Sequence, residues 1–194
     1  MSWRQLPNAI TLLRIASVAP IVWLLRAGEY RIAFWVALAA GASDGLDGWL
    51  AKRFDWRTRL GGLLDPVADK LLLNACYLGL WGAGHVPTWL AVLIVGRDLV
   101  IFGGAVGYHW LIAPLKANPT LLSKATTLAQ IVLLVAWLLD LAYLPLGEGT
   151  LLAGAALVAA LTAASGIDYV LRWSLRAWRQ ARARGNRRRT VEGR

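Results

Sequence analysis

The stretch SDGLDGWLAKRFDWRTRLGGLLDPVADK, from Ser43 to Lys70, places four carboxylates between two long apolar runs. They belong to Asp44, Asp47, Asp65 and Asp69. Charged groups at membrane depth are costly and are usually functional. The first two aspartates are three residues apart and the last two are four apart, so each pair lies on one face of a helix. Two such helices predict a binuclear site of oxygen ligands, which suits two Mg²⁺ or Mn²⁺ ions.

Apolar residues make up 58% of the 194-residue chain, and they come in blocks long enough to cross a bilayer. This pattern predicts an all-α integral membrane protein, with a bundle of six transmembrane helices over residues 1–171 and a basic tail over residues 172–194. The single cysteine excludes an internal disulfide. The six predicted spans are Ala9–Ala27, Ile32–Leu50, Leu60–Leu80, Thr88–Val106, Leu121–Leu139 and Thr150–Leu171.

The formal net charge of +10 is concentrated near the end of the chain. Nine arginines and one glutamate between Arg172 and Arg194 give this tail a charge of +8. A basic tail can bind nucleic acid, but directly after an apolar span it is better explained as a cytoplasmic anchor that attracts anionic lipid. We therefore expect membrane lipids, and no nucleic acid, among the partners.

Charges in the connections between the predicted spans orient the bundle. The second and fourth connections carry basic residues, including Lys52 and Lys116, whereas the third carries none and the fifth carries only acids. The positive-inside rule then puts both termini and the four aspartates on the cytoplasmic side of the inner membrane. The aspartates would face a pocket there that is open to soluble nucleotides.

Small residues accompany the aspartates on the same helix faces. The two stripes are Asp44, Asp47, Gly48 and Ala51, and Gly61, Asp65 and Asp69. Small side chains let a bulky ligand approach the backbone while the carboxylates hold metal against it. Glycines also serve helix–helix packing in membranes. Between paired aspartates, however, the pattern favours a bound diphosphate that is bridged by two metal ions.

This stretch resembles the signature of the CDP-alcohol phosphatidyltransferase family: Asp-x-x-Asp-Gly-x-x-Ala-Arg, eight residues, Gly, three residues, Asp, three residues and Asp. Every position matches except Lys52, where the family usually has arginine. Leu6–Ile15 resembles the family's N-terminal Pro-Asn-x-x-Thr-x-x-Arg-Ile segment. Gly96–Asp98 and Ser123–Gln130 resemble its polar insertions in the fourth and fifth spans. The resemblance covers essentially the whole chain except the basic tail.

The resemblance implies a six-helix membrane enzyme, commonly a homodimer, that makes a phospholipid. In this family pattern, the four aspartates hold two divalent ions against the diphosphate of CDP-diacylglycerol. Asp69 matches the position proposed as general base, which takes the proton of the acceptor hydroxyl as that hydroxyl attacks the phosphatidyl phosphorus and CMP leaves. A cluster of like charges around metal is able to tune one carboxylate as a base.

The resemblance also implies which residues bind CDP-diacylglycerol. The implied set is Asn8, Gly48, Ala51, Lys52, Thr58 and Gly61. Gly48, Lys52 and Thr58 match positions that contact the cytidine nucleotide, and Asn8 is expected nearby. Lys52 keeps the charge of the family's arginine but lacks the planar fork that binds phosphate through two hydrogen bonds.

Three further cations within the predicted spans, Arg14, Arg97 and Lys124, are expected to line a pocket for the acceptor alcohol. The reason is that charges inside membranes tend to line functional cavities. Arg97 and Asp98 are adjacent and face different directions on one helix, so we do not expect them to pair with each other. For Asp168, in the sixth span, a basic residue on a neighbouring helix is the candidate partner.

The resemblance leaves two acceptors open. In the family's phosphatidylglycerophosphate synthases, the fifth span usually carries a second lysine where this chain has Thr126, and the fourth span has Arg-Glu where this chain has Arg97-Asp98. Both differences are more typical of the family's cardiolipin synthases, whose acceptor is phosphatidylglycerol. We therefore favour phosphatidylglycerol, with glycerol 3-phosphate as the alternative. If position 126 senses the acceptor's charge, Thr126→Lys should favour glycerol 3-phosphate.

Two other classes of protein are also compatible with acids in membrane helices. Such acids build ion or metal transport pathways, but here they gather at one leaflet, and the one acid in the middle of another span is Asp98. A membrane-anchored scaffold that displays the basic tail would leave the four aspartates unexplained. Release of CMP from CDP-diacylglycerol separates an enzyme from both.

Overall fold

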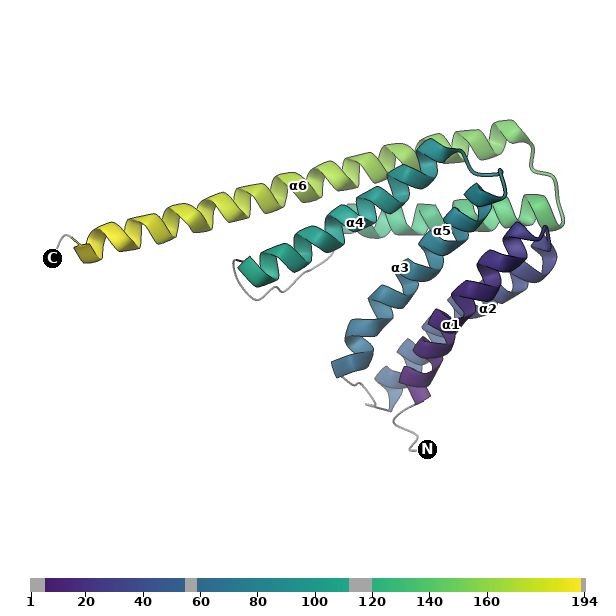
Figure 1. Ribbon diagram of the computed structural model, residues 1–194, viewed down its shortest axis with the longest axis horizontal. Helices are drawn as coiled ribbons and strands as arrows, with labels where there is room; N and C mark the ends of the chain where they lie inside the picture. Colours follow the sequence, from purple (N-terminus) through teal and green to yellow (C-terminus); the bar gives the residue numbers. More distant parts are fainter. Residues whose placement is uncertain (1–5, 55–58, 112–119, 193–194) are drawn as a thin grey trace.

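The computed structural model describes the backbone of residues 6–54, 59–111 and 120–192, and the side chains of residues 9–43, 45, 53–54, 65–104, 120–172 and 174. Within these ranges the chain forms six helices and no strand (Figure 1). The helices are α1 Leu6–Arg26, α2 Tyr30–Arg53, α3 Arg59–Gly82, α4 Thr88–Leu111, α5 Leu121–Ala142 and α6 Glu148–Glu192. Each predicted span falls on one helix, which confirms the all-α, six-helix architecture.

Short turns join α1 to α2, α3 to α4 and α5 to α6, and they lie on one side of the molecule (right in Figure 1). Each turn contains a glycine with a positive φ: 81° at Gly28, 85° at Gly84 and 84° at Gly147. Glycine adopts this left-handed conformation without the steric cost that a Cβ adds, so it can end a helix sharply. These turns make the two helices of each pair antiparallel, so the end of α2 at Arg53 and the start of α3 at Arg59 lie at the opposite end of the bundle (Figure 1).

The helices bury one apolar core between them. Helix α1 packs against α2 and α3, while α5 packs against α2 and α6, and α4 packs against α3 and α6. Close approach of α1 and α3 depends on Gly79, because a Cβ at this position would lie 2.7 Å from Cδ1 of Leu25. The largest fully buried apolar side chains are Ile21, Leu25, Tyr77, Leu80, Leu90 and Ile94.

The outer surface of the bundle is apolar, as a membrane-embedded protein requires. In the part of the chain that the structure describes, three stretches are long and apolar enough to cross a membrane: Ala9–Arg26, Leu121–Ala142 and Glu148–Arg172. Many large apolar side chains are exposed, among them Trp23, Trp35, Val92, Leu99, Phe102, Leu128 and Leu157. An exposed apolar surface of this extent is stable against lipid tails rather than water.

Helix α6 is 45 residues long and continues without a break from the sixth span into the basic tail (Figure 1). Arginine and alanine are frequent after Leu171, and both are good helix formers. The tail is thus helical up to Glu192, which composition alone did not predict. One helix runs through the predicted boundary, and the division into a bundle of residues 1–171 and a basic tail of residues 172–194 stays a prediction.

Candidate active site

Asp65 and Asp69 lie one turn apart on α3, and both contact α1. The Thr11 hydroxyl donates a hydrogen bond to Oδ1 of Asp65 at 2.8 Å. The Arg14 guanidinium donates to Oδ1 of Asp69 at 2.7 Å. Thr11 and Arg14 are buried, whereas the Asp69 side chain is 46% exposed. Helix α1 therefore holds both carboxylates from inside the bundle, and the Asp69 carboxylate is still accessible.

The other half of the aspartate motif lies mostly outside the described residues. Five of the predicted site residues lie on α2 and one lies on α3: Asp44, Asp47, Gly48, Ala51 and Lys52, and Gly61. Their side-chain environments lie outside the described residues. The same is true of the Asn8 side chain and of the whole of Thr58. Among the described side chains, no group of three or more His, Cys, Asp or Glu residues is placed to hold a metal ion. The metal set and the nucleotide set therefore stay predictions.

The two motif carboxylates on α3, those of Asp65 and Asp69, are ligands of the kind that a hard divalent cation binds. Asp65 and Asp69 share one face of α3, since their hydrogen-bond partners Thr11 and Arg14 also lie one turn apart on α1. Carboxylate oxygens are the ligands that Mg²⁺ and Mn²⁺ prefer. Helix α2, which carries the other two aspartates, packs against α3. The backbone arrangement is thus compatible with four carboxylates around one site.

A polar network surrounds Asp98 in the middle of the bundle. Its Oδ1 accepts hydrogen bonds from Lys70 Nζ at 3.0 Å and from Arg97 at 2.7 Å, and its Oδ2 accepts one from Asn74 at 3.3 Å. Lys70 also donates to the Thr127 hydroxyl at 3.3 Å. The network therefore links α3, α4 and α5 through side-chain hydrogen bonds around one buried carboxylate.

The pairing of Arg97 with Asp98 contradicts the sequence prediction that these neighbours would not meet. Their Cβ atoms do point in different directions on α4, but the long arginine side chain folds back to the carboxylate. Both side chains are nearly fully buried, at 4% and 7% exposed. Arg97 also donates to the hydroxyls of Ser123 on α5 and Ser165 on α6, each at 2.7 Å. Burial of both charges makes their pairing necessary, because an unpaired charge in the core is costly.

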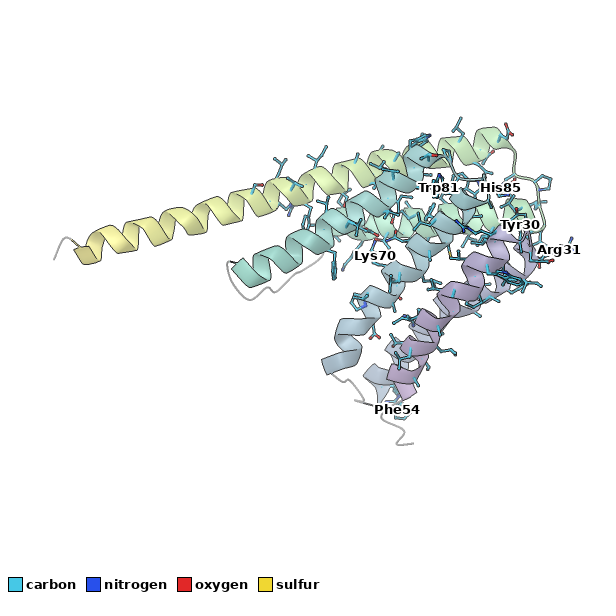
Figure 2. The ribbon with its side chains drawn as sticks, viewed as in Figure 1. Tyr30, Arg31, Phe54, Lys70, Trp81 and His85 are labelled. Atoms are coloured by element: carbon cyan, nitrogen blue, oxygen red, sulfur yellow. The ribbon has the colours of Figure 1, made fainter. Side chains whose placement is uncertain are left out.

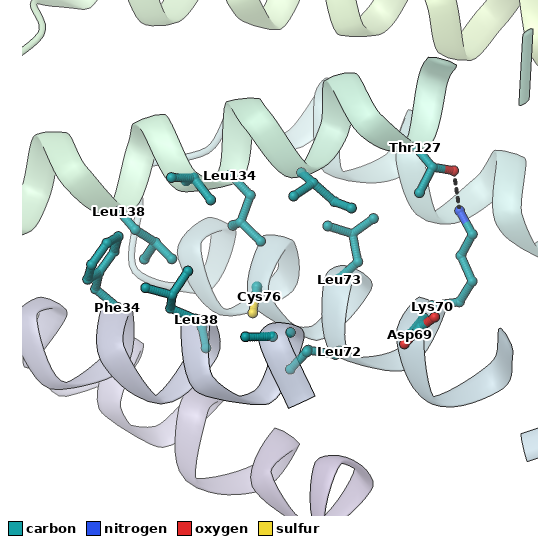
Figure 3. A pocket seen from close by; sticks show the side chains of 15 residues that line it. Phe34, Leu38, Asp69, Lys70, Leu72, Leu73, Cys76, Thr127, Leu134 and Leu138 are labelled. Atoms are coloured by element: carbon teal, nitrogen blue, oxygen red, sulfur yellow. Dashed lines mark hydrogen bonds between the residues drawn. The ribbon is translucent and has the colours of Figure 1, made fainter. Parts of the chain in front are cut away.

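A pocket of about 340 Å³ opens between α2, α3 and α5 (Figure 3). Asp69, Lys70 and Thr127 form its polar end, and Phe34 and Leu138 lie at its far end (Figure 3). The remaining lining is almost entirely apolar: Ala37, Leu38, Gly41, Ala42, Leu72, Leu73, Cys76, Ile131, Leu134 and Val135. Such a shape suits a molecule with a charged head and a hydrocarbon tail.

The three cations predicted to bind the acceptor do not form one cluster. Arg14 contacts Asp69, and Arg97 contacts Asp98. Lys124 is exposed on α5, and within the described residues no side-chain hydrogen bond or ion pair joins it to either carboxylate. Their shared role in acceptor binding stays a prediction.

Thr126 faces α6 rather than the pocket. Its side chain is fully buried, and its hydroxyl donates to the backbone carbonyls of Leu122 at 2.8 Å and Leu161 at 3.2 Å. A lysine at this position would point into the α5–α6 interface. The neighbouring Thr127 is the residue of this segment that reaches the pocket. The absence of a second lysine at position 126 therefore carries little weight in choosing between the acceptors.

Three polar residues at or beside the pocket were not predicted: Lys70, Asn74 and Thr127. Lys70 follows Asp69 directly, and Asn74 lies one turn further on the same face of α3, so helical spacing was the available signal. Asp168 pairs with Arg172 at 2.6 Å, one turn along α6 itself, rather than with a neighbouring helix. The same spacing rule would have identified that pair.

Comparison with known proteins agrees with this arrangement. The model of the CDP-alcohol phosphatidyltransferase family matches residues 4–166, which include the whole aspartate motif and all of the pocket. The chain belongs to this family. Membership argues against the transporter and scaffold interpretations of the acidic helices, and it confirms the resemblance that the aspartate motif indicated.

Relatives within the family carry two kinds of name. A chloroplastic CDP-diacylglycerol–glycerol-3-phosphate 3-phosphatidyltransferase of Oryza sativa is 33% identical over 70% of this chain and 46% of its own length. The human cardiolipin synthase is 31% identical over 68% of this chain and 49% of its own. A probable phosphatidylglycerophosphate synthase of Mycobacterium tuberculosis is 31% identical over 87% of this chain and 81% of its own length. This chain thus spans about half the length of the rice and human relatives.

The fold is also seen in a solved structure. The apo phosphatidylinositol phosphate synthase of Mycobacterium tuberculosis superposes with a TM-score of 0.63 over 84% of this chain and 86% of its own. The two sequences are 22% identical. The match supports the six-helix arrangement and carries no further conclusion about substrate.

Proposed function

We propose that the protein transfers a phosphatidyl group from CDP-diacylglycerol to the hydroxyl of a glycerol-type acceptor and releases CMP. The observation that carries this proposal is the position of Asp69, which belongs to the family motif and lines the polar end of an otherwise apolar pocket. A lipid substrate needs both environments, because its hydrocarbon tail must stay out of water while its diphosphate meets charged groups.

Two divalent ions, Mg²⁺ or Mn²⁺, would be held by Asp44, Asp47, Asp65 and Asp69. When bound, they supply positive charge that stabilises both the attacking and the leaving oxygen. On this chain, Thr11 and Arg14 orient the two α3 carboxylates through the hydrogen bonds at 2.8 Å and 2.7 Å. Such support keeps ligands and bases in a productive geometry.

Asp69 is the proposed general base. Its carboxylate takes the proton of the acceptor hydroxyl, whose oxygen forms a new bond to the phosphatidyl phosphorus. The phosphoanhydride bond breaks at the same phosphorus, and its electron pair leaves with CMP. The exposure of Asp69 supports this role, because a base must be reachable by the substrate that it deprotonates.

The family motif supports a nucleotide site on the side of α2. Its proposed residues are Asn8, Gly48, Ala51, Lys52, Thr58 and Gly61. Lys52 would contact a phosphate as a point charge, whereas the family's usual arginine would bind it through two hydrogen bonds. For the hydrocarbon tails, the apolar walls of the pocket between α2 and α5 are the proposed contact surface.

We propose phosphatidylglycerol as the acceptor, and glycerol 3-phosphate is the alternative. Relatives of both kinds match the chain, so their names do not favour either one. With Thr126 facing α6, the remaining reason for phosphatidylglycerol is the Arg97-Asp98 sequence in α4. The proposed acceptor-binding cations of the spans are Arg14, Arg97 and Lys124. Arg14 and Arg97 are buried and paired with Asp69 and Asp98, so their proposed contribution is to the charge around the site.

We further propose that the protein works as a homodimer in the inner membrane, with both termini and the aspartates on the cytoplasmic side. The basic connections and the arginine-rich end of α6 support this orientation through the positive-inside rule.

Competition between the two acceptors tests the proposed function. Purified protein with Mg²⁺ and labelled CDP-diacylglycerol is offered phosphatidylglycerol and glycerol 3-phosphate together, and the lipid products are separated by chromatography. Cardiolipin with equimolar CMP supports the first acceptor, and phosphatidylglycerophosphate as the sole product supports the second. No labelled lipid product with either acceptor would contradict the proposal.

A further inference from the structure

Two cations share one carboxylate in the polar network. Lys70 and Arg97 both donate to Oδ1 of Asp98, at 3.0 Å and 2.7 Å. The nearest carboxylate along α3, that of Asp69, is already engaged by Arg14. Among the described side chains, the Lys70–Asp98–Arg97 group thus carries one net positive charge within the bundle. A surplus charge at this depth is costly and is typical of a site that receives a charged ligand.

Of the two cations, Lys70 is the one that reaches the pocket. Its side chain is 35% exposed, whereas that of Arg97 is 4% exposed and is held on its other side by two serines. Lys70 lies near the middle of α3, and its side chain points toward α4 and α5 (Figure 2). It lines the same polar end of the pocket as Asp69 and Thr127 (Figure 3).

The Lys70 ammonium is positioned by the protein and still has a donor to offer. An ammonium has three N–H groups. One donates to Asp98 at 3.0 Å and one to the Thr127 hydroxyl at 3.3 Å. Because these two bonds fix Nζ, much of the entropy that a lysine loses on binding a ligand is already lost. The third N–H is available to an anion in the pocket.

We propose that Lys70 is an acceptor-binding residue that binds the phosphate of the acceptor alcohol. This inference rests on the proposed function. Both candidate acceptors carry such a phosphate, either within the headgroup of phosphatidylglycerol or free in glycerol 3-phosphate. With the phosphate at Lys70, the acceptor is held at the end of the pocket that Asp69 also lines, where its hydroxyl meets the proposed base. Asp98 and Thr127 act as positioning residues for the ammonium.

The test compares Lys70→Met, which removes the charge, with Lys70→Arg, which keeps it. The full chain in detergent is assayed for CMP release at saturating CDP-diacylglycerol, with phosphatidylglycerol varied in one arm and glycerol 3-phosphate in the other. Loss of a charge-assisted hydrogen bond should raise the acceptor KM about ten- to a hundredfold in Lys70→Met. The KM for CDP-diacylglycerol should stay nearly unchanged, and Lys70→Arg should keep most of the acceptor affinity.

Arg172→Met is the matched control, because it removes a cation that is paired within α6 and does not line the pocket. Its acceptor KM should equal that of the wild type. The acceptor whose KM rises in Lys70→Met, phosphatidylglycerol or glycerol 3-phosphate, is the one whose phosphate Lys70 binds. A folded, active Lys70→Met protein with an unchanged acceptor KM in both arms would overturn the assignment. A wild type that releases no CMP in either arm would instead contradict the proposed function.

A second measurement needs no turnover, and its comparison of the wild type with Thr127→Val needs no stable Lys70→Met variant. Glycerol 3-phosphate should raise the melting temperature of the wild type, because a ligand that binds only the folded state stabilises it. The shift should shrink in Thr127→Val, which removes one of the two groups that position the ammonium, and should vanish in Lys70→Met. An equal shift in the wild type and in either variant would refute a phosphate site at Lys70.

Discussion

Arg14 and Asp69 lie 2.7 Å apart across the α1–α3 interface, the arginine side chain fully buried and the aspartate side chain 46% exposed. The cation therefore supports the carboxylate from inside the bundle, and the carboxylate can still meet a substrate. In the proposed function, this asymmetry lets the ion pair orient the Asp69 carboxylate as well as join two helices. It also explains why an arginine is tolerated in an otherwise apolar span, since its charge is matched by a motif aspartate.

Arg14→Met should lower kcat about ten- to a hundredfold, because a charge-assisted hydrogen bond that orients Asp69 is lost. CMP release at saturating substrates measures the effect. Ser17→Ala is the control: the Ser17 hydroxyl donates only to the backbone carbonyl of Arg14 in the same helix, and its removal should leave kcat unchanged. Wild-type turnover in a folded Arg14→Met variant would show that the pair is structural.

Asp65→Asn should weaken metal binding, because a neutral amide replaces a proposed ligand charge. The concentration of Mg²⁺ for half-maximal activity should rise by at least about tenfold, and excess Mn²⁺ should recover part of the rate. Thr11→Val, which removes only the hydroxyl that donates to Asp65 at 2.8 Å, should give a smaller change in the same direction. Full activity of the wild type after chelation and dialysis would exclude a metal role for these aspartates.

Lys52→Arg should preserve or improve binding of CDP-diacylglycerol, since arginine can bind a phosphate through two hydrogen bonds where lysine makes a point contact. Lys52→Ala should raise the KM for CDP-diacylglycerol about tenfold or more. Initial rates at varied CDP-diacylglycerol and fixed acceptor provide the comparison. If Lys52→Ala has the wild-type KM, the side chain does not reach the nucleotide.

The shared carboxylate in the network predicts an order of stability. Asp98→Asn should lower the melting temperature in detergent more than Arg97→Met does. The first change leaves Lys70 and Arg97 without their common anion, whereas the second leaves Asp98 paired with Lys70 at 3.0 Å. Removing one partner of a buried pair costs about 3–5 kcal/mol. The reverse order would mean that the arginine–serine bonds, rather than the ion pairs, hold α4, α5 and α6 together.

The helical framework was predictable because each span is an apolar run whose backbone must satisfy its own hydrogen bonds in a membrane. The placement of Asp65 and Asp69 on one face of α3 was predictable from their spacing, whereas the metal role of the four motif aspartates stays a prediction. The reach of side chains was not predictable: the geometry of α4 alone separates Arg97 from Asp98, yet the long, flexible arginine side chain brings its guanidinium to the carboxylate. Likewise, the sequence does not say which face of α5 meets α6, so the lack of a lysine at position 126 was used in choosing the acceptor although Thr126 faces another helix.

The site around Lys70 is built from residues that are distant in the sequence. The position of Lys70 next to Asp69 was visible, but its significance depends on a carboxylate from α4 and a hydroxyl from α5. These partners lie 28 and 57 residues away along the chain. Only the packing of three helices brings them together, so local spacing could not identify the site.

The most direct test of the account follows one phosphorus atom through the reaction. CDP-diacylglycerol labelled at the phosphatidyl phosphate is incubated with purified protein, Mg²⁺ and the acceptor, and labelled lipid and released CMP are both quantified. The account predicts that the label moves to the acceptor with one CMP per product, and that Asp69→Asn lowers this rate by about 10²- to 10⁴-fold, as loss of a general base does. CMP release without transfer of the label to the acceptor, or near wild-type transfer by Asp69→Asn, would contradict it.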